Sequence, residues 1–253
     1  FSAKLFPGFN QAISQESRVQ PGKSVTWDVG LELASHRDDL IVPLGFHGPG
    51  IALGLSYIQR TNGIQFKAPA QFKFDFLQNR YAHMGLTFSI DITPTILKPI
   101  HRSDKKGQFF MGLAFPFKLT NYFPFSWDDA HLYWFTINSG SLVLDWEPPL
   151  RKNKKLLFHI ELPVLSRISR PPVYRMDKQD QGLAWLGFKS TAAKRQYETA
   201  SISHYQGLVM RADYVANPIS AWSIQFEYDR YSDPKDVWAI NTSIYYSREL
   251  RKW

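Results

Sequence analysis

The sequence predicts an all-β fold arranged as a single antiparallel barrel, and three observations lead to it. Apolar residues recur at every second position over many segments, which is typical of strands with one apolar face. No segment has a comparable helical period, and turn signals separate the alternating runs, which favours antiparallel pairing. The chain has 253 residues, and barrels of about 250 residues commonly form one domain. About 12 strands are expected, with 10 or 14 as alternatives.

The alternating runs follow one another along most of the chain. In order they cover residues 25–33, 51–57, 64–76, 84–92, 109–117, 133–137, 142–146, 156–162, 208–214, 222–228 and 238–246. Residues 181–190 are ambiguous, and residues 1–23 have no clear pattern. We therefore expect an N-terminal segment over 1–23, either periplasmic or plugging the lumen, and a barrel domain over 24–253.

One hairpin follows from the register of its apolar residues. A two-residue turn at Ser139–Gly140 would place six apolar side chains on one face, whereas a continuous strand would flip their parity. These side chains are Tyr133, Phe135, Ile137, Leu142, Leu144 and Trp146. Residues 61–63 and Asn217–Pro218 are further turn signals.

Composition excludes several classes of protein. The chain contains no Cys, so a disulfide scaffold, a thiolate metal site and a Cys nucleophile are impossible. Hydrophobic residues make up 44% and aromatic residues 15%, which argues against disorder. The mean hydropathy is −0.30, and no long apolar run indicates a membrane-spanning helix. Residues 1–10 lack the apolar core of a signal peptide, so the protein is either cytoplasmic or has lost an export signal.

The composition of the two strand faces indicates which face is outside. A soluble sheet should carry many Lys and Glu residues on its water-facing side. Here the polar face combines small residues with isolated charges, and the other face carries large aromatic residues. This pattern predicts a transmembrane barrel with its bulky face toward lipid. Pro69, Pro116 and Pro163 lie in or beside expected strands, where each removes a hydrogen-bond donor from the ladder. We expect a bulge or a position at the barrel rim to accommodate each of them. A soluble secreted β-sandwich that binds a ligand is the alternative fold.

Over residues 24–247 the pattern resembles bacterial outer-membrane β-barrels as a class, without pointing to a particular family. The resemblance implies a removed signal peptide, insertion by the barrel-assembly machinery and residence in the outer membrane. Aromatic residues near the strand ends would then lie at the lipid interface: Trp27, Trp146, Trp222, Tyr228, Trp238 and Tyr246. With a periplasmic start, the three turns above would be periplasmic. The longer stretches 95–106 and 165–180 would be periplasmic as well, although short turns are expected there.

The polar face predicts a lumen that is rich in acidic residues. The charged residues expected to face it are Asp28, Glu32, Asp75, Asp91, Glu161, Arg211, Asp213, Glu227 and Asp229. The net charge of +8 therefore resides in loops and termini. An acidic lumen argues against an anion channel. A barrel of this size leaves little interior space, which favours a salt-bridge network that plugs the lumen over a conducting pore.

No catalytic residue, metal site or cofactor is expected. Outer-membrane lipid-modifying enzymes need a Ser and a His together near the lipid boundary, and Ser203 and His204, as neighbours on a strand, would point to opposite faces. The acidic and His-containing segments 36–39 and 128–131 lack the ligand spacing of a calcium or zinc site.

The function most consistent with these features is that of a barrel subunit in a larger envelope complex for secretion, assembly or transport. The alternatives are a narrow small-solute or cation-preferring channel, an outer-membrane lipid-modifying enzyme, and the soluble binding protein. Expected partners are outer-membrane lipid, lipopolysaccharide phosphates contacted by basic loops, and other envelope proteins. Nucleic acid is not expected, because aromatic residues and bases do not share one surface.

Overall fold

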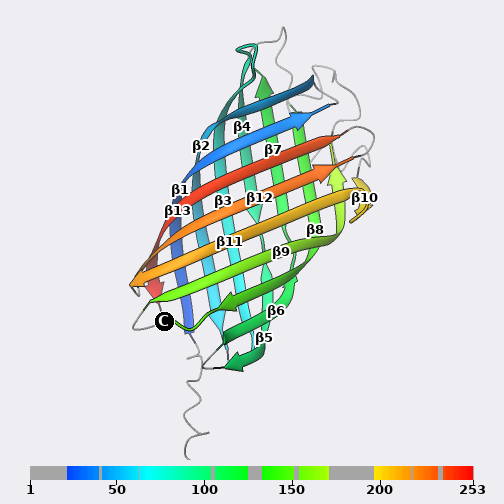
Figure 1. Cartoon of the computed structure of the whole chain (residues 1–253). Helices are drawn as coiled ribbons and strands as arrows, with labels where there is room; N and C mark the ends of the chain where they lie inside the picture. The colour runs from blue at the N-terminus through cyan, green and yellow to red at the C-terminus, as the bar shows by residue number, and fades with distance from the viewer. Residues whose placement is uncertain are drawn as a thin grey trace, which may run out of the picture.

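The chain folds into one twisted antiparallel sheet that closes on itself (Figure 1). The computed structural model describes residues 22–39, 42–61, 63–103, 106–124, 133–150, 154–170, 197–217, 219–232 and 236–252. Its strands are β1 (Gly22–Asp38), β2 (Val42–Arg60), β3 (Gln65–Gln78), β4 (Met84–Ile92), β5 (Thr95–Ser103), β6 (Gly107–Ala114), β7 (Phe117–Pro124), β8 (Tyr133–Glu147), β9 (Lys155–Ser169), β10 (Tyr197–Ser201), β11 (Tyr205–Asn217), β12 (Ser220–Tyr231) and β13 (Val237–Lys252). Within these ranges, no helix has the length and apolar character needed to cross a membrane.

Ten of these strands form the closed circuit. Their order is β1-β2-β3-β4-β7-β8-β9-β11-β12-β13, and β13 pairs again with β1. The predicted all-β antiparallel barrel is therefore confirmed, and the alternative of ten strands is the number in the circuit.

The three remaining strands extend strands of the circuit. β4 and β5 both pair antiparallel with β3, so they run in one direction and are interrupted only at Thr93–Pro94. β7 and β6 share β8 in the same way, with the break at Phe115–Pro116. β10 and β11 share β9. Proline lacks the N–H that a ladder needs, which accounts for two of the breaks. The carbonyls of Pro94 and Pro116 still accept hydrogen bonds from Phe115 and Ser139.

The two ends of the barrel differ. At one end Ser24 pairs with Lys252, and this end, here called the terminal end, also carries the β2–β3, β5–β6, β8–β9 and β11–β12 connections. The opposite end, the loop end, carries the β1–β2, β3–β4, β7–β8, β9–β10 and β12–β13 connections, of which the longest lies between Ser169 and Tyr197.

The predicted hairpin at Ser139–Gly140 is wrong. Both residues lie inside β8, which runs without reversal from residue 133 to 147. The prediction assumed that Ile137 faces lipid, but its side chain is 2% exposed and packs inside the loop end against Ile168, Ala200, Tyr205 and Tyr231. Because Ile137 faces inward, the alternation of β8 continues through Ser139 and Gly140, and no turn is needed to explain it. Removing this reversal moves residues 165–170 away from the terminal end, and residues 171–180 lie outside the described residues. Most of 95–106 is strand rather than loop.

The other flagged prolines lie within strands. Pro69 pairs with Ser56 inside β3. Pro163 pairs with Ser141 beside a register shift between β8 and β9. Val164 and Leu165 next to it are both exposed, as expected for a bulge that reverses the parity of β9.

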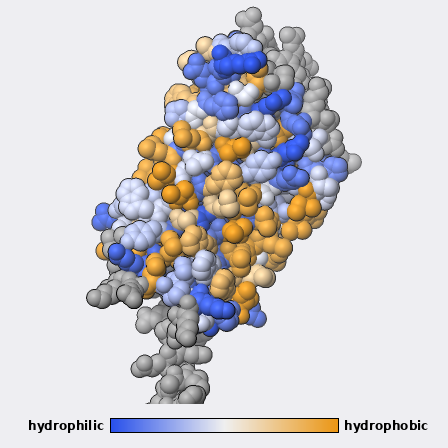
Figure 2. Space-filling view, viewed as in Figure 1, coloured by the Kyte–Doolittle hydropathy of each residue, from blue (hydrophilic) through white to orange (hydrophobic). Residues whose placement is uncertain are grey.

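Large apolar side chains cover the outside of the barrel. Leu31 and Leu33 of β1 are 72% and 67% exposed, whereas Glu32 between them is 2% exposed. Figure 2 shows hydrophobic side chains across the middle of the visible face and hydrophilic ones gathered toward its upper end. Polar and charged residues fill much of the interior, together with apolar clusters. The cluster around Ile137 and a second one of Ala34, Phe46, Leu77 and Tyr122 lie toward the loop end.

Candidate functional site in the lumen

All nine charged residues predicted to face the lumen lie inside the barrel. Asp28, Glu32, Asp75, Glu161 and Glu227 are at most 5% exposed. The other four border an internal cavity: Asp91, Arg211, Asp213 and Asp229. Their positions follow from strand parity, because each one neighbours residues that face outward.

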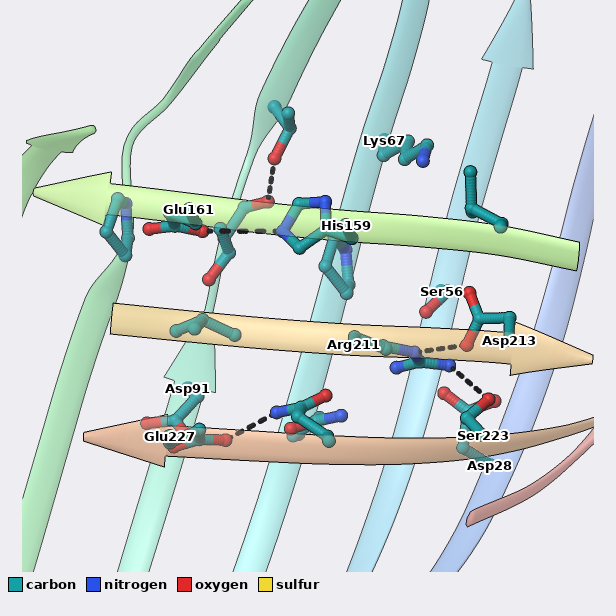
Figure 3. A pocket seen from close by; sticks show the side chains of 18 of the residues that line it. Asp28, Ser56, Lys67, Asp91, His159, Glu161, Arg211, Asp213, Ser223 and Glu227 are labelled. Atoms are coloured by element: carbon teal, nitrogen blue, oxygen red, sulfur yellow. Dashed lines mark hydrogen bonds and ion pairs between the residues drawn. The ribbon is translucent and has the colours of Figure 1, made fainter. Parts of the chain in front are cut away.

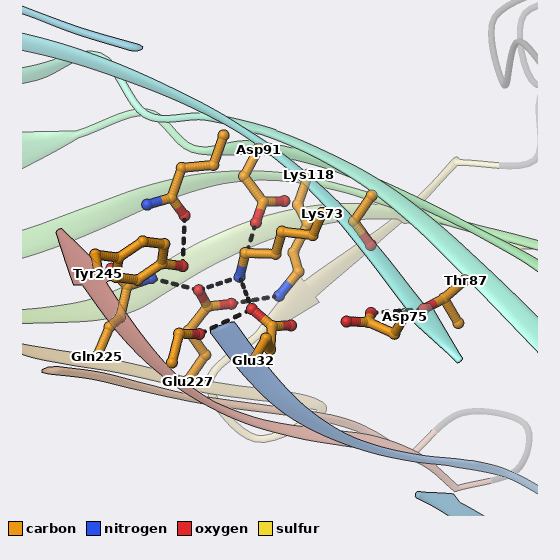
Figure 4. Close-up of polar contacts among 12 residues, drawn as sticks. Glu32, Lys73, Asp75, Thr87, Asp91, Lys118, Gln225, Glu227 and Tyr245 are labelled. Atoms are coloured by element: carbon orange, nitrogen blue, oxygen red, sulfur yellow. Dashed lines mark hydrogen bonds and ion pairs between the residues drawn. The ribbon is translucent and has the colours of Figure 1, made fainter. Parts of the chain in front are cut away.

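An ion cluster crosses the middle of the lumen (Figure 4). Lys73 of β3 donates to Glu227 of β12, and its Nζ also lies 3.4 Å from Glu32 and 3.5 Å from Asp91. Lys118 of β7 lies 3.1 Å from Glu227 and 2.6 Å from Asp229. We call these six residues, Glu32, Lys73, Asp91, Lys118, Glu227 and Asp229, the central ion cluster.

The central ion cluster joins opposite walls. In the circuit, β2, β1 and β13 stand between β3 and β12 on one side, and β4, β7, β8, β9 and β11 on the other. The Lys73–Glu227 ion pair therefore spans the lumen rather than joining neighbouring strands. With both partners buried, the pair is poorly screened by solvent and acts as a brace between the walls.

Two more ion pairs cross the lumen nearer the terminal end. Lys67 of β3 donates to Asp145 of β8 at 2.5 Å. Arg60 of β2 lies 3.5 Å from Glu147 of β8. His159 Nδ1 contacts Asp145 Oδ1 at 2.7 Å. Strand parity places Asp145 of β8 and His159 of β9 on the polar, inner face, and the structure has both of them there.

The central ion cluster separates two cavities. The larger one, about 350 Å³, reaches from strand ends at the terminal end, such as Arg60 and Lys155, to Lys118, Glu227 and Asp229. The smaller one, about 40 Å³, lies toward the loop end beside His36 and Asp75. Lys118 and Asp229 border both cavities. Lys118 and Asp229 of the cluster thus lie between the two spaces, and on the side of β8 and β11 the larger cavity also borders Ile137 and Tyr205.

A further ion pair lies in the wall of the larger cavity (Figure 3). Arg211 of β11 donates to Asp213 at 2.6 Å and to the hydroxyl of Ser223 at 3.1 Å. Asp28 of β1 borders the same space. The guanidinium is thereby held against the wall, with its Nε and one terminal nitrogen already bonded.

The predicted interface aromatics lie in bands on the outside. Toward the terminal end, Trp27, Tyr246 and Trp222 contact one another edge to face across β1, β13 and β12. Trp146 stacks between Phe109 and Phe158 at 5.7 and 5.4 Å. Tyr57, Phe66 and Tyr214 extend this terminal aromatic band.

Tyr228 and Trp238 lie toward the loop end. The eight-residue step from Trp238 to Tyr246 on β13 spans about 20 Å across the membrane, at about 3.4 Å per residue and a tilt of about 40°. Transmembrane barrels carry an apolar band about 25 Å tall between such girdles. A closed sheet leaves no unpaired backbone for lipid. The chain is therefore a transmembrane β-barrel of the outer-membrane type.

No protein-family model matches the sequence, and no curated protein does. Among solved structures, the translocator domain of the autotransporter NalP from Neisseria meningitidis is similar at 8% identity, with 94% of this chain and 91% of that chain covered and a TM-score of 0.43. The outer membrane protease OmpT from Escherichia coli matches at 7% identity over 92% and 96%, with a TM-score of 0.43. An outer membrane channel from Pseudomonas putida F1 matches at 8% identity over 98% and 100%, with a TM-score of 0.42. We transfer no residue role across such distant likenesses.

One Ser–His contact escaped the sequence analysis. Ser35 and His47 oppose each other on β1 and β2, and Ser35 Oγ lies 2.6 Å from His47 Nδ1. Strand pairing brings them together across 12 residues, so sequence adjacency could not reveal them. Among the described residues no carboxylate hydrogen bond orients His47, which a nucleophile–base pair requires. Nor do these residues group three His, Asp or Glu side chains that could hold a metal. Ser203 and His204 are exposed, at the break between β10 and β11.

Proposed function

We propose that this protein is an occluded outer-membrane barrel that acts as the membrane-embedded subunit of a larger envelope assembly. The observation that carries the proposal is the central ion cluster. It links β3 and β7 to β12 across the lumen and separates the two cavities. A barrel closed in this way contacts its partners at its two ends and does not pass solutes through its lumen.

The energetics of the cluster support a lumen that stays closed. Removing one partner of a buried ion pair typically costs about 3–5 kcal/mol, because the remaining charge loses its compensation. Opening a path past Glu227 would separate it from both Lys73 and Lys118. Apolar clusters fill the interior toward the loop end as well.

The terminal end offers a surface for a partner. Exposed basic residues gather there at the ends of strands: Lys23, Lys98, His101, Lys106 and Lys154. Complementary charge guides association and suppresses wrong partners. We infer a partner with an acidic surface at this end. Contacts with lipid headgroups and lipopolysaccharide phosphates remain part of the proposal.

A narrow cation-preferring channel is the second candidate. The larger cavity is bordered by more acids than permanent bases: Asp28, Asp91, Glu147, Glu161, Asp213, Glu227 and Asp229 against Arg60, Lys67, Lys118, Lys155 and Arg211. Rings of carboxylates favour cations in pores. In this case the central ion cluster would be a gate rather than a permanent plug.

Planar-bilayer recording separates the two candidates. The purified barrel should give no steady current at moderate voltage. A steady current with cation selectivity would favour the channel and contradict the occluded barrel.

The subunit role has its own test. After extraction from the native membrane in mild detergent, light scattering should give a protein mass well above the 29.3 kDa of one chain. A monodisperse single chain under these conditions would contradict a stable assembly.

A further inference from the structure

Asp28 is a buried carboxylate whose charge is not compensated directly. The residue is 3% exposed, and its side chain borders the larger cavity. Within the described part of the chain, its carboxylate forms neither an ion pair nor a hydrogen bond. This contrasts with Asp213 in the same cavity, which is paired with Arg211 at 2.6 Å. A buried carboxylate that accepts no hydrogen bond is costly, so the position calls for an explanation.

The backbone around Asp28 leaves space for a bound group. On one side Asp28 pairs with Gly54 of β2, and on the other with Ser247 of β13. A Cβ on Gly54 would lie 3.0 Å from the Asp28 carboxylate, so the glycine gives the carboxylate room to lie over β2. The hydroxyl of Ser247 is buried and has no hydrogen-bond partner among the described residues. Directly opposed residues on paired strands have Cβ atoms about 5 Å apart. Two polar groups with unused capacity are thus neighbours.

The neighbouring cation does not complete this site. Arg211 attracts Asp28 electrostatically, but its guanidinium donates to Asp213 and Ser223. Lys67 is held by Asp145. Two carboxylates, Asp28 and Asp213, thus face the single positive charge of Arg211, so the region beside Asp28 keeps an attraction for positive charge.

The walls of the cavity indicate what kind of ligand body could lie beside the charged group. Apolar side chains border it on several strands, among them Ile58, Leu157, Val209 and Val215. Its volume of about 350 Å³ lies within the usual range for small-molecule sites, and such sites combine apolar walls with a few placed polar groups.

We propose that this cavity binds a small organic cation, with a primary ammonium held by Asp28 and Ser247 and an apolar body against Ile58 and Val215. An ammonium donates up to three hydrogen bonds, which matches a carboxylate and a hydroxyl side by side. Charge-assisted hydrogen bonds of this kind are about twice as strong as neutral ones. The ligand enters from the terminal end, where the cavity reaches the strand ends. The site does not depend on whether the central ion cluster opens, so it stands apart from the proposed function.

Calorimetric titration of the purified full chain in detergent tests the proposal, with phenethylammonium as the probe and 2-phenylethanol as its neutral counterpart. The ammonium should bind at least about tenfold more tightly than the alcohol. The substitution Asp28→Asn should abolish this preference, and Asp28→Glu should restore part of it. Asp75→Asn removes a buried carboxylate outside the larger cavity and should leave the preference unchanged. Titration of empty micelles corrects for partitioning.

The outcomes are distinguishable even if one variant folds poorly. Heat-modifiable migration on gels reports whether each variant forms the barrel. Gly54→Ala is a second route, because its methyl group crowds the Asp28 carboxylate and should weaken ammonium binding several-fold. Equal binding of amine and alcohol, or unchanged ammonium binding by folded Asp28→Asn, would overturn the proposal.

Discussion

Lys73 is the side chain on which the proposed closure of the lumen depends most. It is 1% exposed, and three carboxylates from β1, β4 and β12 converge on its ammonium group. A long cationic side chain rarely reaches such burial unless it is paired. From β3, the ion pairs of Lys73 therefore reach β1 and β12, which are not neighbours of β3 in the sheet.

Replacing Lys73 should destabilise the barrel strongly. Lys73→Met leaves Glu227 and its neighbours without their main counter-ion, so the free energy of unfolding in urea should fall by about 3–5 kcal/mol. Lys106→Met, at an exposed turn position, should change it by less than about 0.5 kcal/mol.

A second substitution identifies the cause of that loss. Adding Glu227→Gln to Lys73→Met removes a buried charge that has lost one of its two counter-ions and should recover part of the stability. If the double variant is as unstable as the additive sum, the two side chains are not coupled, and the brace across the lumen is wrong.

Individual lumen residues could be predicted from parity, but their pairing could not. Period-two alternation placed Asp75 and Glu227 on the inner face of their strands. It contains no information on which strand lies opposite, so the Lys73–Glu227 contact required the circuit order. The face to which an aromatic residue points was harder to predict. Tyr245 is fully buried beside Gly30, where its ring occupies the space that a side chain on Gly30 would fill.

At the scale of elements, β8 shows where sequence patterns mislead. The hairpin at Ser139–Gly140 rested on the rule that all large apolar residues of a barrel face lipid. That rule fails at the loop end, where Ile137 and Ile168 fill the interior. The same prediction raised the expected strand count, because it divides residues 133–137 and 142–146 into two strands, although both lie in β8.

Two glycine substitutions test these elements together. Gly112→Ala places a methyl carbon 1.8 Å from the Ile96 carbonyl oxygen on β5, and the resulting strain should cost about 1–3 kcal/mol. Gly140→Ala meets nothing within 4 Å. In a continuous strand it should be neutral or stabilising by about 0.5 kcal/mol.

Urea unfolding of the two variants provides the comparison. A large loss from Gly140→Ala would indicate a turn that needs glycine and would contradict the continuous β8. Full stability of Gly112→Ala would contradict the close approach of β5 and β6.

At the scale of the whole molecule, the barrel reverses the usual distribution of polarity. Ile224 and Ile244 are paired on β12 and β13 and are more than half exposed, whereas Ser223 and Ser243 beside them are 1% exposed. This inversion was predictable from the composition of the two faces. The cross-lumen ion pairs on which the proposed occlusion rests were only partly predictable, because they depend on which strands lie opposite each other.

The orientation of these two faces is the central claim, and site-directed spin labelling tests it most directly. The chain has no Cys, so single-Cys variants in liposomes report on one position each. Labels at Ile224→Cys and Ile244→Cys should collide more with lipid-dissolved oxygen than with a water-soluble nickel complex. Ser243→Cys, at a buried position outside the larger cavity, should resist labelling until the barrel is unfolded. Preferential collision with the nickel complex at Ile224 and Ile244 would place these residues in water and contradict the transmembrane barrel.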